Sequence, residues 1–387
     1  MTSYLQEEHR EVWEWFNSAE SKSNYSDEVE LHLLKTTYRM ERENHTELYA
    51  LTDEVLQALC ITVPVTLYKS HGTTFSSAAL FFTPGHGHVV LVGGVMELLN
   101  DEEMKSLLAH ELSHFKLWTE ESGAYLVTDQ VLNTMRNEPR AENNHVQSAR
   151  FFQLYTEIFA DRGGLIVTNE KAMISTLIKV HTGMKEVNPE SYLQQAEEIF
   201  SKDKSSSEGR THPELYIRVK AIRANSECSD EEEYETVLQS LIEGKRTLEN
   251  YDLLAQQAAT EETKEFLNYH LRHPWLQTET VMAHLKHFFL DFEFSDIEDI
   301  SLNLEKEAQP TKSYYAYLLL DFASVDPELE ENAIAASFQT AEEIGIADDL
   351  ENLIRKELRL LKKDAVRIRK NAGKMVQQAS GEAAINN

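Results

Sequence analysis

The chain has 387 residues, of which 41% are hydrophobic and 27% are charged, so it is long enough for two or three domains that each bury a core. Its formal net charge of −29 argues against nucleic acid and anionic membrane surfaces as partners, because the long-range field of the protein repels both. The two cysteines, Cys60 and Cys228, are too few for a disulfide framework or a cysteine-only zinc site, and they fit a reducing compartment.

The sequence predicts neither secretion nor membrane insertion. Residues 1–16 lack a basic region followed by an apolar run, so we expect no secretory signal. The longest mainly apolar stretch, residues 89–99, is shorter than the roughly 20 residues that a membrane-spanning helix needs. We therefore expect a cytoplasmic protein with no transmembrane segment.

The first part of the chain predicts helices followed by a small sheet. Residues 1–60 contain no Gly or Pro, and their apolar side chains recur three and four positions apart, which predicts helix. Alternating β-branched residues predict a strand over residues 61–68, and a second strand is expected over residues 88–92. The Thr-Pro-Gly sequence at residues 83–85 predicts the turn that precedes it.

The rest of the chain has mainly helical patterns. Asn100 followed by Glu103 predicts a capping box at the start of a helix that ends near Trp118. Residues 119–148 are polar and predict an irregular connection. Further helices are expected at about 147–167, 171–183 and 211–224 and throughout the region after residue 226, with a flexible loop at residues 201–210.

The sequence His-Glu-Leu-Ser-His at residues 110–114 lies on the first of these helices. His110 and His114 are four positions apart, so both imidazoles project from one face and can bind one zinc ion. Glu111 lies beside them, where it can act as general base toward a water that the metal activates. The motif is short, and the alternative is a solvated helix face with incidental histidines.

A second pair of polar residues lies on another apolar helix. Glu157 and Asp161 are four positions apart among several Phe, Leu and Ile residues, and carboxylates are costly to bury there unless they are paired or bind metal. Glu157 can therefore supply the third ligand that a catalytic zinc needs. Asp161 can hold the other ring nitrogen of a liganding histidine. The alternative is two solvent-facing acids on an amphipathic helix.

Together these segments resemble a known family. HELSH and EIFAD, with TPGHGHVVLVGGVMELL before them and THPELYIRVKAI after, are similar to the gluzincin metallopeptidases of the HtpX and CAAX-prenyl-protease type over about residues 33–225. The resemblance implies an α+β, mainly α fold, a zincin-like helical protease domain with a small sheet whose edge strand lines the active-site cleft. A peptide could extend that edge strand. By position, the edge strand would comprise His88, Val89, Val90, Leu91 and Val92.

The resemblance also implies roles for single residues. His110, His114 and Glu157 match the ligands of one Zn²⁺ per chain, Glu111 matches the general base, and Asp161 matches the acid behind a liganding histidine.

His212 and Arg218 match the His-Pro…Arg segment of the family. His212 could stabilise the oxyanion of the tetrahedral intermediate, or it could bind the metal and hold the enzyme latent; a surface histidine at a helix start is the alternative. Arg218 is expected to be structural and to pair with a carboxylate of the site.

The chain departs from the family in two respects. Residues 79–82 read Ala-Leu-Phe-Phe where relatives often have Asn-Ala-Phe, and no transmembrane helices are predicted. The second departure favours a soluble endopeptidase over an intramembrane one. His86 and His88 are expected to line the cleft, although they could bind metal. Five other histidines have no matching acid spacing: His145, His270, His273, His284 and His287. Of these, His284 and His287 lie on a helix rich in Phe and Leu and are expected to be structural.

We expect an N-terminal helical segment at residues 1–32, the peptidase domain at 33–225 and an all-helical domain at 226–387. Within the last domain, residues 314–357 resemble TerB-like helical domains. We expect the TerB-like portion to cover about residues 265–360. The resemblance depends on the Glu-Ile-Gly-Ile turn and on the spacing of Asp321, Val325, Asp326 and Glu328.

The TerB-like resemblance implies binding of a metal or of a protein partner. Asp-Phe-Ala stands where the family has Ala-Asp-Gly, so we expect a docking module for a protein partner. The basic last helix predicts a solvated face, or a contact with an acidic patch of this protein or of a partner.

The sequence therefore predicts a soluble zinc endopeptidase that acts on a peptide or protein substrate. The alternative is a non-proteolytic, zinc-stabilised interaction protein that acts through its helical C-terminal domain. Two imidazoles and one carboxylate would also accept other divalent ions.

Overall fold

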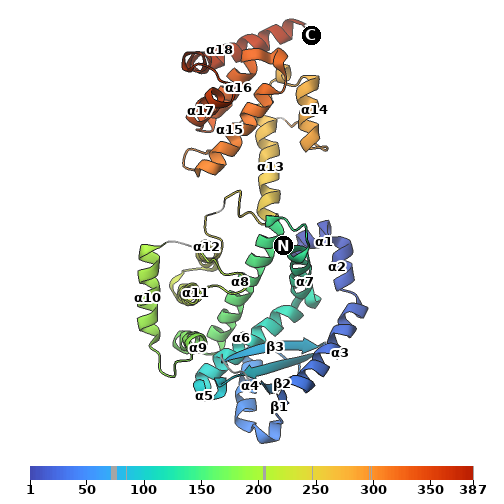
Figure 1. Cartoon of the computed structure of the whole chain (residues 1–387), viewed down its shortest axis with the longest axis vertical. Coiled ribbons are helices and arrows are strands. Elements are labelled where there is room, and N and C mark those ends of the chain that lie inside the picture. The colour runs from blue at the N-terminus through green and yellow to red at the C-terminus, as the bar shows by residue number, and fades with distance from the viewer. Residues whose placement is uncertain are drawn as a thin grey trace. The chain divides into compact units, whose positions relative to one another are not determined.

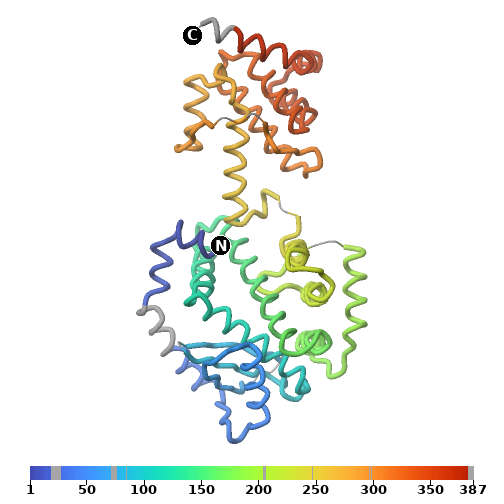
Figure 2. The backbone as a smooth tube through the Cα atoms, turned by 180° about the vertical axis from the view of Figure 1, so that it is seen from behind, coloured from blue at the N-terminus to red at the C-terminus, as the bar shows by residue number. Residues whose placement is uncertain are grey.

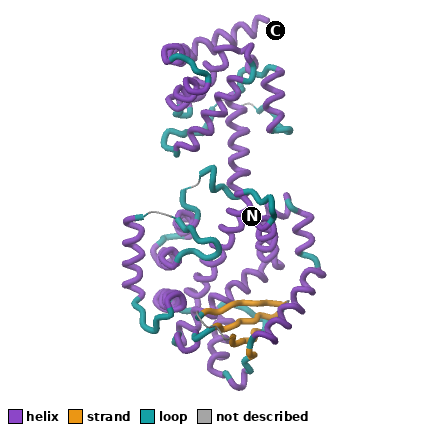
Figure 3. The backbone as a smooth tube through the Cα atoms, in the orientation of Figure 1, coloured by secondary structure: helices purple, strands orange, loops and turns teal. Residues whose placement is uncertain are grey.

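The computed structural model describes residues 1–70, 76–83, 85–203, 206–245, 247–295, 297 and 299–386, without the side chains of residues 19–27 and 382–386. The chain divides into two compact units, Met1–Arg246 and Thr247–Asn387. The described residues form many helices and one small sheet, which confirms the predicted α+β, mainly α class (Figures 1 and 3). No helix among them is long and apolar enough to cross a membrane.

The sheet belongs to the first unit and has four strands in the order β1-β2-β4-β3. Its strands are β1 (Tyr38–Arg39), β2 (Val65–Ser70), β3 (Ser77–Thr83) and β4 (His86–Val92). β2 and β4 pair in parallel, and the other two pairs are antiparallel. The expected turn at residues 83–85 includes Pro84, which lies outside the described residues.

The expected edge strand over His88–Val92 is wrong, because β4 lies between β2 and β3. Val89 and Leu91 on one face of β4 pack into the main core of the unit, while Val90 on the other face packs against Leu33. A strand that is covered on both faces typically has a continuous run of apolar residues. Residues 88–92, with the sequence His-Val-Val-Leu-Val, have this pattern. The edge strand beside the HELSH helix is instead β3.

Helices cover most of residues 1–60 as expected, apart from β1. The helices are α1 (Thr2–Glu8), α2 (Arg10–Phe16), α3 (Ala19–Thr36) and α4 (Thr46–Ala58). Val29 and Leu33 of α3 pack against Tyr68 and Val90, so α3 covers one face of the sheet. Leu108 and Leu112, on the HELSH helix, belong to the core on the other face.

Two helices carry the residues of interest, α6 (Asp101–Thr119) and α8 (Asn143–Val167), and they pack against each other. The remaining helices around them are α5 (Val95–Leu98), α7 (Ala124–Asn137), α9 (Glu170–Thr182), α10 (Pro189–Lys202) and α11 (Leu215–Glu227). The prediction of an irregular connection over residues 119–148 is wrong. Val127, Val131 and Leu132 recur at helical spacing and bury the inner face of α7.

Residues after 226 do not all belong to the second unit. Helix α12 (Glu231–Ile242) is part of the first unit. Its Tyr234 and Leu238 pack into one cluster with Leu154 of α8 and Ile217 of α11. The first unit therefore extends past the expected boundary at residue 226, because the apolar face of α12 completes this cluster.

The described residues of the second unit form helices and no strand, as expected for this region. Its helices are α13 (Leu253–His270), α14 (Glu279–Phe288), α15 (Gln309–Ser324), α16 (Glu330–Glu343), α17 (Ala347–Glu357) and α18 (Lys362–Asn386). Their core is built around Phe266, Leu319 and Phe338. Figure 2 shows the same helices from behind.

Several charged residues of the second unit have partners within it. Arg369 of the basic last helix binds Glu342 at 2.7 Å and Asp348 at 2.6 Å, so part of this helix contacts an acidic patch of the same unit. Asp326 accepts a hydrogen bond from Thr278 at 2.6 Å, and Asp321 lies 2.7 Å from His284. Both aspartates of the TerB-like spacing are thus held by side chains of the unit itself.

Candidate metal centre

Helix α6 begins with the capping box that the sequence predicts. The Asn100 side chain accepts the backbone N–H of Glu103 at 3.0 Å, and the Glu103 carboxylate accepts the N–H of Asn100 at 2.9 Å. Lys179 of α9 donates to the same carboxylate at 2.7 Å, and both side chains are buried. The start of α6 is therefore fixed by α9 as well as by its own cap.

Helices α6 and α8 approach closely where α8 has two glycines. A Cβ atom at Gly163 would lie 1.8 Å from Oγ and 2.7 Å from Cβ of Ser113, and a Cβ at Gly164 would lie 2.4 Å from Sδ of Met173. Only residues without a side chain fit at such a crossing. This close approach brings the HELSH face of α6 against the Glu-Ile-Phe-Ala-Asp turn of α8.

The crossing brings three ligand-type side chains together. Nε2 of His110 lies 3.3 Å from Nε2 of His114, and Glu157 places Oε1 3.4 Å from His114 Nε2 and Oε2 3.7 Å from His110 Nε2. One ligand atom from each residue lies within 4.8 Å of the other two. His110 and Glu157 are buried, and His114 is half-buried. This is the only group of three or more such side chains with this spacing in the described part of the chain.

These separations fit a small tetrahedral cation. Two ligands at about 2.05 Å from one zinc ion, at the tetrahedral angle, would lie about 3.3 Å apart, which is the separation of the two histidine nitrogens. In addition, Oε2 of Glu157 is buried and has no hydrogen-bond partner among the described residues. A buried carboxylate oxygen without a partner is costly, and a cation among these three side chains would satisfy it.

Asp161 holds one of the two imidazoles from behind. Its Oδ1 lies 2.9 Å from Nδ1 of His110, which leaves Nε2 of that ring facing Glu157. Arg218 of α11 donates to both carboxylate oxygens of Asp161, with Nε 2.7 Å from Oδ2 and Nη2 2.5 Å from Oδ1. The same guanidinium lies 3.7 Å from Oε2 of Glu157. Sequence matching predicted that Arg218 pairs with a carboxylate of the site, and in the structure it contacts two.

The charges of this cluster stabilise one another. Burial alone would raise the pKa of Glu157, but His114, His110 and Arg218 outweigh burial and hold that pKa well below its ordinary value. Burial also opposes the charge on Asp161, yet Arg218 and His110 lower its pKa. Both carboxylates are thus ionised near neutral pH, as a cation site requires.

Glu111 is buried beside the two histidines on α6 and is 8% exposed. Burial alone would lower the pKa of Arg218, but Asp161, Glu157 and, more weakly, Glu111 raise it. Glu111 therefore lies within electrostatic reach of the cluster.

His212 faces the cluster from the segment before α11. Its Nε2 lies 3.5 Å from Oε1 of Glu157, although its side chain is 63% exposed. Thr211 Oγ1 lies 2.9 Å from the other ring nitrogen. The ring is thus accessible to solvent and also directed at Glu157. A surface histidine without a role would not need this orientation.

Hydrogen bonds fix the segment that carries His212. Arg150 of α8 donates through Nε to the carbonyl of Gly209 at 2.8 Å and through Nη2 to the carbonyl of Ser207. Glu214 accepts the Ser207 hydroxyl at 2.8 Å and the N–H of Glu208 at 2.9 Å. The expected flexible loop at 201–210 is therefore tied to α8 in its second half, while residues 204–205 lie outside the described residues.

The residues of β4 do not join the cluster. His88 is 4% exposed and lies 3.3 Å from both the Tyr68 and Thr83 hydroxyls. Burial, with a smaller effect of His86, lowers the pKa of His88 to about 4, so the ring is neutral near pH 7. His86 stacks on His88 with ring centroids 4.5 Å apart. Both histidines are thus engaged within the sheet.

The sequence did not identify three residues that support the metal centre and its surroundings: Arg150, Lys179 and Ser113. No local pattern marks Arg150 or Lys179, since each acts on a segment distant in sequence. The Gly163-Gly164 pair inside a helix was a usable signal, because glycine is disfavoured in helices unless something approaches closely.

Comparison with known proteins bears on this part of the chain. Residues 76–226 match the model of peptidase family M48. The match supports a relation of this segment to the M48 metallopeptidases, and it spans both helices of the cluster as well as His212 and Arg218. No curated protein and no solved structure matches the chain.

Proposed function

We propose that the first unit is a zinc-dependent endopeptidase whose metal ligands are His110, His114 and Glu157. The observation that carries this proposal is the convergence of three ligand atoms within 4.8 Å of one another from two separate helices. The match of residues 76–226 to peptidase family M48 supports the same reading. The relation to the HtpX and CAAX-prenyl-protease type, and a cytoplasmic location, are part of the proposal.

A zinc ion bound there would supply a Lewis acid that polarises the scissile carbonyl and makes water ionise near neutral pH. Glu111 would accept a proton from the attacking water and pass it to the leaving amine. Asp161 would keep His110 in the orientation in which Nε2 faces the metal, and Arg218 would keep Asp161 ionised.

The substrate would lie along β3 and not along β4. β3 is an edge of the sheet, and its Phe82 packs edge-on against Phe115 of α6, with ring centroids 6.3 Å apart. An extended peptide could pair with the outer edge of β3 through main-chain hydrogen bonds, which gives affinity without strong sequence preference.

His212 has two possible roles in this proposal. With its ring exposed and directed at Glu157, it could donate to the oxyanion of the tetrahedral intermediate. It could also supply a further nitrogen to the metal and hold the enzyme latent. The two roles predict opposite effects when His212 is replaced by alanine: activity falls in the first and rises in the second.

Replacing Glu111 by glutamine tests the proposal, because glutamine keeps the size of the side chain but cannot act as the base. The unmodified, zinc-loaded protein should cleave casein, and a chelator should stop this cleavage. The Glu111→Gln variant should not cleave casein, although its zinc content stays near one per chain. A His212→Ala variant is measured alongside, so that a latent enzyme is not taken for an inactive one. Full activity of Glu111→Gln, or no activity in any form that binds zinc, would refute the proposal.

The second unit is proposed to be a docking module for a protein partner, in line with its TerB-like spacing. Its aspartates at 321 and 326 are paired with His284 and Thr278, which favours docking over metal binding there.

A further inference from the structure

A hollow of about 520 Å³ lies between α8 and α12. Tyr155, Phe159 and Arg162 line it from α8, where they form one stripe at helical spacing. Glu157 and Asp161 project from a different stripe of the same helix, about two fifths of a turn away. This hollow, which we call the α8–α12 groove, is therefore separate from the metal centre.

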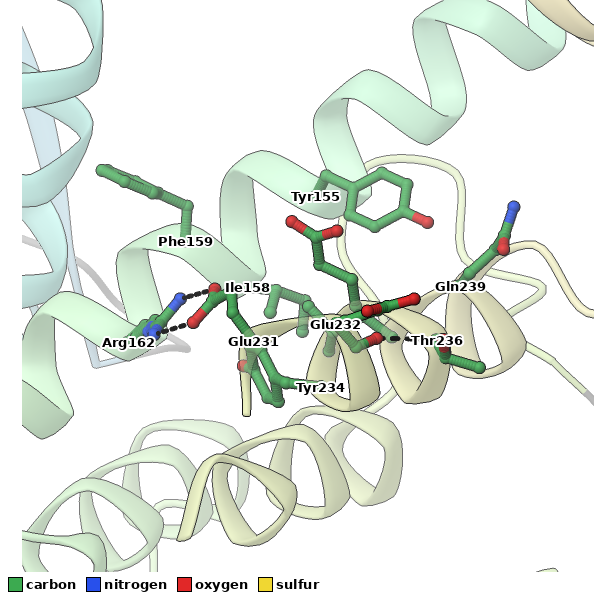
Figure 4. A pocket seen from close by; sticks show the side chains of 11 residues that line it. Tyr155, Ile158, Phe159, Arg162, Glu231, Glu232, Tyr234, Thr236 and Gln239 are labelled. Atoms are coloured by element: carbon green, nitrogen blue, oxygen red, sulfur yellow. Dashed lines mark hydrogen bonds and ion pairs between the residues drawn. The ribbon is translucent and has the colours of Figure 1, made fainter. Parts of the chain in front are cut away.

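The groove combines aromatic faces with carboxylates (Figure 4). Phe159 is 38% exposed, and the Tyr155 hydroxyl donates to Glu243 at 2.9 Å, which fixes its ring. Glu231, Glu232 and Glu235 line the groove from α12. Aromatic faces and carboxylates together attract cations and disfavour anions.

The groove already holds one cation of the chain itself. Arg162 binds Glu231 through two hydrogen bonds of 2.5 Å and 2.8 Å, and its guanidinium lies 5.1 Å from the centroid of the Tyr234 ring. A guanidinium between a carboxylate and an aromatic face is a favourable arrangement. The contacts of Arg162 thus show that the side chains lining the groove can bind a cationic side chain.

Two carboxylates and one hydroxyl of the groove make no side-chain ion pair or hydrogen bond within the described part of the chain. Glu232 and Glu235 form no ion pair with any residue that the structure describes. Tyr234 is 5% exposed, and its hydroxyl makes no hydrogen bond within the described part of the chain. Burial raises the pKa of Tyr234 to about 12, so its hydroxyl stays protonated at neutral pH and can donate or accept a hydrogen bond.

We propose that the α8–α12 groove binds a basic segment of a protein partner, with an arginine or lysine side chain against its aromatic faces and its charge beside Glu232 and Glu235. A hollow of about 520 Å³ is larger than one side chain requires and falls within the range for ligand pockets, so apolar neighbours of that cation are expected to enter too. This inference goes beyond the proposed proteolysis, because binding here requires neither metal nor cleavage.

Fluorescence anisotropy with a labelled peptide of alternating arginine and leucine tests the proposal. The full-length Glu111→Gln protein is used, so that cleavage of the probe cannot interfere. Replacing both Glu232 and Glu235 by glutamine should raise the Kd about tenfold, the result of losing two charge contacts. Phe159→Ala should raise it about fivefold through the lost aromatic face. A peptide with glutamate in place of arginine should not bind.

The matched control is the double variant Glu8→Gln, Glu11→Gln. These two exposed glutamates have the same spacing and the same charge, but they lie on α1 and α2 away from the lining of the groove. This control should leave the Kd within about twofold, because only the screened long-range field changes. An equal loss in both double variants, an unchanged Kd for Phe159→Ala, or no binding to the unaltered groove would each overturn the proposal. Circular dichroism of every variant verifies that the fold is intact.

Discussion

Arg218 binds Asp161 through both carboxylate oxygens, at 2.7 Å and 2.5 Å, and Asp161 in turn lies 2.9 Å from Nδ1 of His110. The guanidinium thus sets the orientation of an imidazole that it does not touch. Because Asp161 is buried and the Arg218 side chain is only 14% exposed, water cannot replace their contacts without a loss of stability. This chain of contacts suggests a direct test of the metal centre.

Arg218→Lys should weaken zinc binding by about tenfold, the lower end of the effect of residues that orient metal ligands. A lysine ammonium is a point charge that cannot hold both oxygens of Asp161, so the His110 ring becomes freer to turn. Competition with a chromophoric zinc chelator measures the affinity. Arg223→Lys, on the same helix but paired with Glu170 at 3.0 Å, is the matched control. Equal affinities of the two variants would contradict the assignment of Asp161.

Gly163→Ala should destabilise the first unit by about 2 kcal/mol or more, because overpacking at a tight contact forces the helices apart. The added Cβ would lie 1.8 Å from Ser113 Oγ. Urea unfolding measures the loss, and Ser113→Gly in the same chain should recover part of it. Gly373→Ala is the control, since nothing lies within 4 Å of its added Cβ. If the double variant is no more stable than Gly163→Ala, the contact with Ser113 is not the cause.

Much of this site could be predicted from the sequence because its signals are local. The spacing of His110 and His114, and of Glu157 and Asp161, follows directly from helical geometry, and the Asn100 cap is encoded within four residues. The position of β4 could not be predicted in this way, because an apolar strand can be central or paired on one side, depending on which segments pair with it. The contacts of Arg150 and Lys179 likewise depend on residues far away in the chain.

His270 should make the second unit less stable in mild acid. Its side chain is buried and lies 3.1 Å from the Thr340 hydroxyl, and burial, with Arg272 and His273, lowers its pKa from 6.5 to about 3. Above pH 6.5 the ring is neutral in both the folded and unfolded states and has no effect. Between pH 6.5 and 3 the unfolded chain binds the extra proton, so stability falls as pH falls, by about 2 kcal/mol at pH 5.

Hydrogen exchange of the α13 amides, corrected for intrinsic rates, measures this effect within the intact chain. His270→Gln should remove most of the pH dependence, because glutamine cannot take up the proton. His287→Gln, at a position on α14 where the histidine is exposed, is the control and should retain the dependence. If His270→Gln loses stability in acid as steeply as the unaltered chain, another group is responsible.

Arg150→Ala should release the segment that carries His212. Its guanidinium donates to the carbonyls of Ser207 and Gly209, and no other cation contacts these carbonyls among the described residues. Amide exchange over residues 206–214 should therefore become at least about tenfold faster, as expected when a net stabilisation of about 1.4 kcal/mol is lost. Arg140→Ala, at an exposed position before α8, should leave this exchange unchanged.

The same variant distinguishes the two proposed roles of His212. If His212 stabilises the oxyanion, a loosened segment holds the ring less well and the rate of casein cleavage falls. If His212 holds the enzyme latent, the loosened segment lets the ring leave the metal and the rate rises. Measuring zinc content together with cleavage separates either outcome from loss of the metal. Unchanged exchange in Arg150→Ala would show that Glu214 alone positions the segment, since its carboxylate also holds Ser207 and Glu208.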